Sequence, residues 1–107
     1  MAGKANIVID AGTDWTTTIN VLDDADELFN FTGYTAISQM RKHSSSLNYV
    51  TLNVALHPGE IVLSANASIT LNVMPGRYLY DVLITKNGLA TRIIEGIATV
   101  TPEITKV

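Results

Sequence analysis

The sequence predicts an all-β fold, an immunoglobulin-like antiparallel sandwich of two sheets and about 7–8 strands. Three observations lead to this prediction. Short stretches rich in Val, Ile, Thr and Tyr recur along the chain, turn-forming Gly, Pro, Asn and Asp separate them, and no stretch carries a convincing helical stripe. The 107 residues and the hydrophobic content of 47% suit one core. We therefore expect a single β-sandwich domain over residues 1–107.

Four segments of the first half are predicted to be extended. The clearest is 15–22, whose odd-numbered positions carry Trp, Thr, Ile and Val while positions 16, 18 and 20 are polar. Residues 6–10 form a first strand, 27–33 a short edge segment, and 34–42 a central strand that is covered in part on both faces. The serine-rich residues 43–48 are expected to form a loop.

The second half shows the stronger strand patterns. Residues 49–56 alternate large apolar and polar positions and end at the turn 57–59, and residues 60–64 and 68–74 are predicted to form two further strands. The strongest pattern is that of residues 77–85, one face of which carries Tyr78, Tyr80, Val82 and Ile84. Because Val82 and Ile84 are apolar, their presence on the same face favours a core position for both tyrosines.

A tight hairpin is predicted after residues 77–85. Asn87 and Gly88 favour a type I′ turn, because both central residues of that turn take positive φ. The return strand, residues 89–101, contains Gly96, which marks either a bulge or a close approach of another backbone segment.

A structural corner is predicted at the other end of the same strand. Gly76 and Tyr78 match the Gly-x-Tyr entry into the sixth strand of immunoglobulin-like domains, in which the tyrosine hydroxyl ties the corner to nearby backbone. Tyr80 stands where such domains carry a disulfide cysteine, so the resemblance covers the corner only. The predicted structural residues are therefore Gly76, Tyr78, Asn87 and Gly88.

Composition argues against several classes of partner. Charged residues make up 16% of the chain, the net charge is -3, and the seven basic residues are scattered apart from Arg41-Lys42, so we expect no nucleic-acid binding. No apolar run reaches the ~18 residues of a membrane span, and the N-terminus lacks a signal-peptide core, so we expect no membrane association and synthesis in the cytoplasm of the cell that makes the protein. There is no cysteine.

No catalytic, metal-binding or cofactor-binding set is expected. The acidic residues Asp23, Asp24, Asp26 and Glu27 invite a calcium hypothesis, but they lack the ligand spacing of an EF-hand loop and are typical of a solvated turn. His43 and His57 show no metal-ligand spacing, serines 44–46 lack a nucleophile elbow, and the isolated glycines form no phosphate-binding loop.

Aromatic residues leave a second function open. Trp15, Tyr34, Tyr49, Tyr78 and Tyr80 could form a stacking platform for sugars, although the shared face with Val82 and Ile84 favours the core for the last two. The alternative to a purely structural role is therefore an adhesion module that binds a host surface or a glycan, carried above all by Trp15 and Tyr49.

Taken as a whole, the chain resembles a family of small immunoglobulin-like β domains in virion structural proteins of tailed bacteriophages. The resemblance spans nearly the full length and no single piece of it is decisive. The matching stretches are IDAGTDW (9–15) with INVLD (19–23), FTGYTA (31–36) with QMRK (39–42), PGRYLYDV (75–82) and IEGIATV (94–100).

The resemblance implies a non-enzymatic virion protein of the capsid-decoration, neck, baseplate or fibre-adaptor type. Such a protein docks to other capsid or tail proteins through a β-sheet face or a strand edge, and its low charge suits this role. No coiled coil or fibre domain is appended here, so adaptor and free-standing decoration protein both remain open. A homo-oligomer is one expected state, since symmetric assembly is common.

Overall fold

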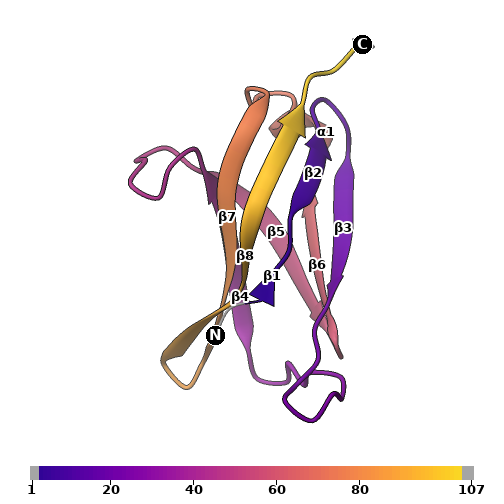
Figure 1. Ribbon diagram of the computed structural model, residues 1–107, viewed down its shortest axis with the longest axis vertical. Coiled ribbons are helices and arrows are strands. Elements are labelled where there is room, and N and C mark those ends of the chain that lie inside the picture. The colour runs from indigo at the N-terminus through magenta and orange to yellow at the C-terminus, as the bar shows by residue number, and fades with distance from the viewer. Residues whose placement is uncertain (1–2, 105–107) are drawn as a thin grey trace.

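The computed structural model describes residues 3–104 and is nearly all β (Figure 1). In chain order its elements are β1 (Gly3–Lys4), β2 (Ile7–Asp10), β3 (Trp15–Asn20), β4 (Thr35–Arg41), β5 (Val50–His57), β6 (Glu60–Ala65), α1 (Ala67–Thr70), β7 (Gly76–Lys86) and β8 (Leu89–Thr101). The all-β class is thus confirmed. Within the described residues, no helix has the length and apolar character needed to cross a membrane.

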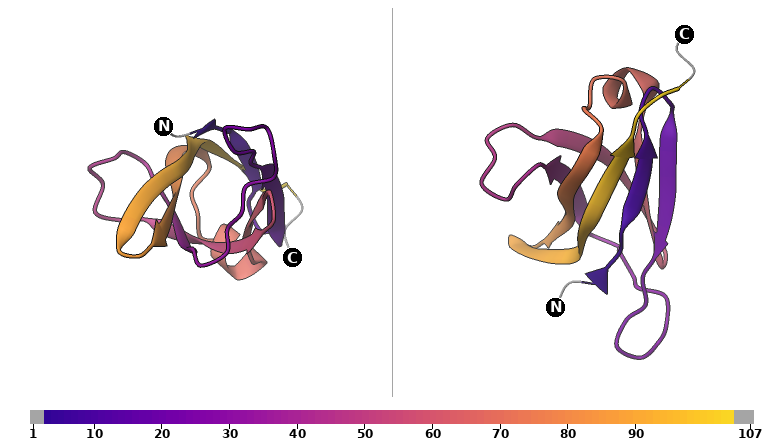
Figure 2. Two further views of the ribbon diagram at one scale, coloured as in Figure 1. Left: turned by 90° about the horizontal axis from the view of Figure 1, so that it is seen from below. Right: turned by 45° about the horizontal axis from the view of Figure 1, so that its top comes forward.

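The strands form one continuous hydrogen-bonded path that curls around the core. Its order is β1-β8-β7-β4-β5-β6-β3, and β2 also pairs with β8. The curl arises at β5, because residues 50–52 pair with β4 while residues 53–57 pair with β6. The end view in Figure 2 shows the strands surrounding a central space that their side chains fill.

The sheet is mixed, so the prediction of a wholly antiparallel arrangement is wrong at one edge. Both β1 and β2 run parallel to β8, with Ile7 opposite Ala98 and Asp10 opposite Thr101. The other strand pairs are antiparallel. A tight turn forces antiparallel pairing, whereas nearly the whole chain separates β2 from β8, so no turn fixes their direction.

Residues 68–74 are not extended, which corrects the strand predicted there. They contain most of α1 and a series of turns. The Asn66 side chain accepts a hydrogen bond from the Ile69 N–H (3.1 Å), and the Asp14 carboxylate accepts one from the Ala67 N–H (2.7 Å). These acceptors satisfy N–H groups of the first helical turn, and such caps outweigh the strand propensity of the segment.

Residues 27–33 also differ from the edge segment that the sequence predicted. They form no strand, although an isolated bridge joins Leu22 and Leu28 and Phe29 makes backbone hydrogen bonds to Val21 and Gly59. The segment instead turns its aromatic residues inward: the Phe31 ring lies 4.6 Å from that of Phe29 and 6.4 Å from that of Tyr34, centroid to centroid. Burial of this aromatic group closes one end of the molecule and outweighs strand pairing.

The core is formed by the inward faces of the strands. The inward face predicted for residues 77–85 is confirmed, because Tyr80, Val82 and Ile84 are buried and Tyr78 is half-buried. The largest fully buried apolar side chains are Ile9, Met40, Leu52, Ile61, Leu63, Val82, Ile84 and Val100. A buried hydroxyl, that of Ser38, donates to the Asp81 carbonyl (2.6 Å), so it is satisfied.

Gly96 marks a close backbone approach, one of the two roles predicted for it. A Cβ at this position would overlap the carbonyl oxygen of Ala5, which belongs to the segment between β1 and β2. That same carbonyl accepts a hydrogen bond from the Tyr80 hydroxyl, and Tyr80 lies opposite Gly96 in the β7–β8 register. The irregularity of the hairpin lies elsewhere, where the register shifts between Val82 and Leu83.

Candidate functional site

The four predicted structural residues lie at the two ends of β7. At its start, the Tyr78 hydroxyl donates to the Met74 carbonyl (2.7 Å), and Gly76 is the first residue of the strand. At its end, Asn87 and Gly88 connect β7 to β8 with φ angles of 53° and 78°. Positive φ at both positions is what a type I′ turn requires. These residues shape the scaffold, and none of the four lies in the groove described below.

The acidic segment folds into a turn that uses its own carboxylate. Asp23 Oδ1 accepts hydrogen bonds from the backbone N–H groups of Ala25 (2.8 Å) and Glu27 (3.0 Å). Asp26 takes a φ of 60°, a conformation that Asp tolerates in turns. Among residues 3–104, no three His, Cys, Asp or Glu side chains gather closely enough to hold a metal ion.

The histidines and serines singled out by the sequence occupy separate places. His43 lies in the loop after β4, where its N–H donates to the Ser46 hydroxyl oxygen (3.0 Å), and His57 ends β5 opposite Glu60. The structure therefore does not bring the two imidazoles together. The bond from His43 to Ser46 orders the loop.

The outer surface of β4, β7 and β8 forms a groove of about 540 Å³, called here the outer groove. Strand register explains its composition, because Gln39 and Glu95 flank Asp81 in one cross-strand row and Arg41 and Ile97 flank Leu79 in the next. Among the residues that line it are Lys4, Gln39, Arg41, Leu79, Asp81, Arg92, Glu95 and Ile97.

Ion pairs cross the outer groove. Lys4 Nζ lies 2.7 Å from Glu95 Oε1, and Arg92 bridges the Asp81 carboxylate (3.0 Å) and the Glu95 carboxylate (3.6 Å). The hydrogen bond and charge of Lys4 hold the pKa of Glu95 below its usual value, and the charge of Arg92 adds to this effect. The charges of these four side chains therefore balance, and the remaining charged residue of the lining, Arg41, is bonded to Ser46 and Gln39.

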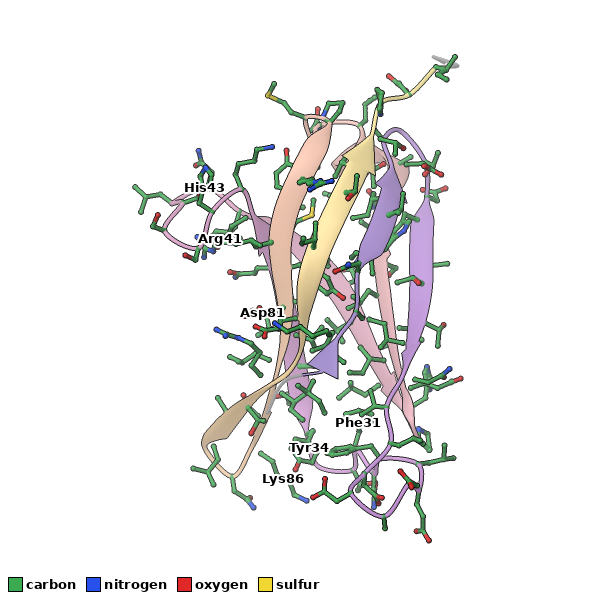
Figure 3. The ribbon with its side chains drawn as sticks, viewed as in Figure 1. Phe31, Tyr34, Arg41, His43, Asp81 and Lys86 are labelled. Carbon is green, nitrogen blue, oxygen red and sulfur yellow. The ribbon has the colours of Figure 1, made fainter. Side chains whose placement is uncertain are left out.

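A protruding loop overhangs one side of the outer groove. Figure 3 shows Arg41 at the base of this loop and His43 within it, with Asp81 farther along β7. The Arg41 guanidinium donates to the Ser46 carbonyl (2.5 Å) and to the Gln39 side chain (3.0 Å), and it stacks on the Tyr49 ring at 4.6 Å. Arg41 thus fixes the loop to the sheet.

Apolar side chains share this outer surface with the ion pairs. Ile37 is 49% exposed, Leu79 48% and Ile97 36%, although all three lie on paired strands. Polar side chains would be more usual on the solvent face of a sheet. This surface therefore combines exposed apolar side chains with charged side chains that are already paired. Such a combination is suited to contact with another protein.

The aromatic residues do not form one platform. The Trp15 indole is half-buried on β3 and donates to the Val8 carbonyl (2.8 Å), whereas Tyr49 precedes β5 and lies against Arg41. Figure 3 places Tyr34 at the opposite end of the molecule from His43, near Lys86, whose Nζ is 5.1 Å from the Tyr34 ring centroid.

Sequence reasoning did not single out the outer groove. One signal was available, because Leu79 and Leu83 alternate with the residues of the buried face and must therefore face outward. No pattern in the sequence indicates the pairing of Asp81, Arg92 and Glu95, because this pairing depends on the register of the hairpin. Only the folded sheet brings these charges together.

Comparison with known proteins supports the fold and no further conclusion. No family model matches the chain, and no curated protein matches it. Two solved structures share the fold at 13% identity over 94% of this chain: an endo-fucoidan hydrolase of glycoside hydrolase family 107, with a TM-score of 0.56, and InlP of Listeria monocytogenes, with 0.53. The filamin domain of Lin-41 aligns with 88% of the chain at 16% identity and a TM-score of 0.46.

This chain spans only part of the first two proteins, 13% of the hydrolase chain and 28% of the InlP chain. Each therefore contains, within a larger chain, a β region whose fold is similar to that of 94% of this chain. At this identity the likeness concerns the fold and carries no activity across.

Proposed function

We propose that this chain is a non-enzymatic structural protein of a tailed-bacteriophage particle that docks on other capsid or tail proteins through the outer surface of β4, β7 and β8. The observation that carries the docking role is the exposure of Leu79 and Ile97, which lie opposite each other, and of Ile37, on the far side of a row of paired charges. Such a surface buries apolar area without leaving unpaired charges behind.

The phage assignment rests on the resemblance of the six stretches quoted above, together with the low proportion of charged residues, 16%. Under this proposal the protein is located in the virion. We also propose that the curled sheet is an immunoglobulin-like sandwich of two layers, with β5 passing from one layer to the other. The split pairing of β5 and the hydrogen bond from Tyr78 to Met74 support this interpretation.

The alternative of a glycan-binding adhesion module has less support. Sugar stacking requires an exposed aromatic face. Trp15 is half-buried, and its indole N–H already donates a hydrogen bond to the Val8 carbonyl. Tyr49 is 52% exposed but stacks against Arg41. A glycan array with Trp15→Ala as its control tests this alternative, and binding that depends on Trp15 would favour it.

Mass spectrometry of purified, mature particles tests the virion assignment. We expect the chain in particles at a constant ratio to a capsid or tail protein, retained through washes in high salt, because apolar contacts are not screened. Absence of the chain from the particles would overturn the assignment.

The docking surface is tested with particles assembled without the chain. Purified wild-type protein should bind them, and Leu79→Arg should bind at least about tenfold more weakly, because it places a charge in the apolar contact. Leu89→Arg is the matched control, since Leu89 is 75% exposed in the hairpin end of β8 and outside the outer groove. Equal binding of Leu79→Arg and wild type would contradict the assignment of this surface.

A further inference from the structure

Strand β3 has an open edge. It ends the path of paired strands, with β6 as its partner within the described residues, and Figure 1 shows it at the margin of the molecule. The Val21 N–H donates to the Gly59 carbonyl, and antiparallel bonds alternate from residue to residue. The backbone N–H and C=O groups of Thr16, Thr18 and Asn20 therefore point away from β6. These three residues are called the open edge.

The neighbouring edge, that of β2, is protected while the open edge is not. On β2, the Val8 carbonyl accepts the Trp15 indole N–H (2.8 Å) and the Asp10 carbonyl accepts the Thr13 hydroxyl (2.7 Å). Strand β3 consists of Trp15–Asn20, WTTTIN, and carries no Lys, Pro or acidic residue of the kind that blocks edge pairing. The open edge is therefore a template for an added strand.

A second groove, of about 460 Å³, begins where the open edge ends; we call it the lower groove. Asn20, the last residue of β3, lies on one side of it, and Gly3 of β1 lies on the other. Its apolar and aromatic lining consists of Val21, Leu22, Phe29, Tyr34, Ile84, Ile93 and Ile94. It could receive one apolar side chain from a strand that pairs with β3.

The charged residues that line the lower groove indicate which kind of segment would bind there. The ionisable acids that line the lower groove are Asp23 and Asp24, and Asp23 is already bonded to backbone N–H groups of its own turn. Lys86 lies against the Tyr34 ring but does not line the groove. A basic residue beside Asp24 would therefore be favoured. A second copy of β3 has no Lys or Arg to offer, so a different chain fits better.

We propose that the open edge and the lower groove together bind an extended segment of a partner protein. The segment adds a strand to β3 through the backbone of Thr16, Thr18 and Asn20, inserts one apolar side chain into the groove, and places a Lys or Arg beside Asp24. This adds a second docking surface to the one proposed above and rests on that proposal for the kind of partner. Its test needs no particle, so failure here and absence from particles are separate results.

Amide hydrogen exchange on the isotope-labelled full chain tests the proposal. The probe is the blocked peptide Lys-Val-Thr-Val-Thr-Val-Thr, and its matched control has Glu in place of Lys. We expect the amides of Thr16, Thr18 and Asn20 to exchange fast in the free protein and about tenfold or more slowly with the Lys peptide. Thr17, whose N–H bonds to β6, should be protected in both states.

Variants of Thr18 separate edge pairing from other binding. Thr18→Pro removes one N–H of the open edge and no bond to β6, so it should weaken peptide binding about tenfold or more. Thr18→Val keeps that N–H and should bind as wild type does. Should Thr18→Pro fail to fold, Asp24→Asn provides the second test: it should abolish the preference for the Lys peptide, whereas Asp26→Asn, outside the groove, should preserve it.

Three results would overturn the proposal. One is unchanged exchange at the open edge with saturating peptide. Another is equal affinity for the Lys and Glu peptides. The third is protection that appears without peptide and grows with protein concentration, which would make a second copy the occupant.

Discussion

The two faces of the β7–β8 hairpin are made by the same two strands and have opposite roles. On the inner face, Val82 and Ala98 are fully buried and Ile84 is 1% exposed, while on the outer face Leu79 is 48% exposed. The inner face is apolar and close-packed, whereas the outer face combines apolar groups with ion pairs. Residue type alone does not decide between core and surface, because strand alternation places Leu79 outside and Tyr80 inside.

This comparison predicts that inner substitutions change stability and outer substitutions change binding. The largest stability effect is expected for Ile84→Ala, which removes three carbons from the core and should lower the free energy of unfolding by about 2–5 kcal/mol. Urea unfolding measures it. Leu79→Ala is the control and should stay within about 1 kcal/mol, because Leu79 is half-exposed. Equal losses in the two variants would contradict the assignment of the faces.

A smaller loss is expected for Gly96→Ala. The new Cβ would overlap the Ala5 carbonyl, so the segment after β1 must move, and we expect a loss of about 1–3 kcal/mol. Faster exchange of the Ala5 amide, which donates to the Glu95 carbonyl (3.0 Å), would locate the damage. Gly3→Ala is the control, since a Cβ there meets the Ile94 side chain at an ordinary 3.4 Å and should cost little.

Tyr80→Phe should lower stability by about 1 kcal/mol, because it removes the hydrogen bond to Ala5. It also changes the response to alkali. Burial raises the pKa of Tyr80 from 10.0 to about 12, so the folded state holds this proton more tightly than the unfolded state does. The stabilisation is complete below pH 10 and lost as pH rises toward about 12.

Unfolding at a series of pH values measures that loss, which cannot exceed about 1.4 kcal/mol per pH unit for one proton. Tyr80→Phe should show a smaller decline over this window than wild type. An identical decline in both proteins would mean that other groups are responsible. Tyr78→Phe, which removes the hydroxyl that donates to the Met74 carbonyl from the same strand face, controls for the loss of a tyrosine hydroxyl as such.

Local signals explain why the hairpin could be predicted from the sequence and the 68–74 segment could not. Asn87-Gly88 and the alternation of residues 77–85 act over a few residues, so their structure is encoded nearby. The 68–74 segment depends in part on Asp14, which caps Ala67 from far along the chain. The chain offered no local sign of this contact.

The same reasoning applies to both grooves. The switch of β5 from β4 to β6 and the parallel pairing of β2 with β8 are contacts between distant segments, and they determine where the sheet curls and where its edges lie. Asp23 and Asp24 are recognisable as turn residues, but only the fold brings them into the lining of one groove with Gly3. The absence of a catalytic set remains a prediction from the sequence.

The smallest stability effect is expected on the outer face, at the pair of Lys4 and Glu95. Exposed ion pairs contribute little, so Lys4→Gln should leave the unfolding midpoint within experimental error. The pKa of Glu95 should nonetheless rise toward its usual value, because Lys4 causes most of its depression, and Arg92→Gln should raise it less. Carboxyl NMR titration measures both. If Arg92→Gln had the larger effect, the main interaction across the outer groove would be that of Arg92 with its two carboxylates, and docking there should then depend on Arg92 more than on Lys4.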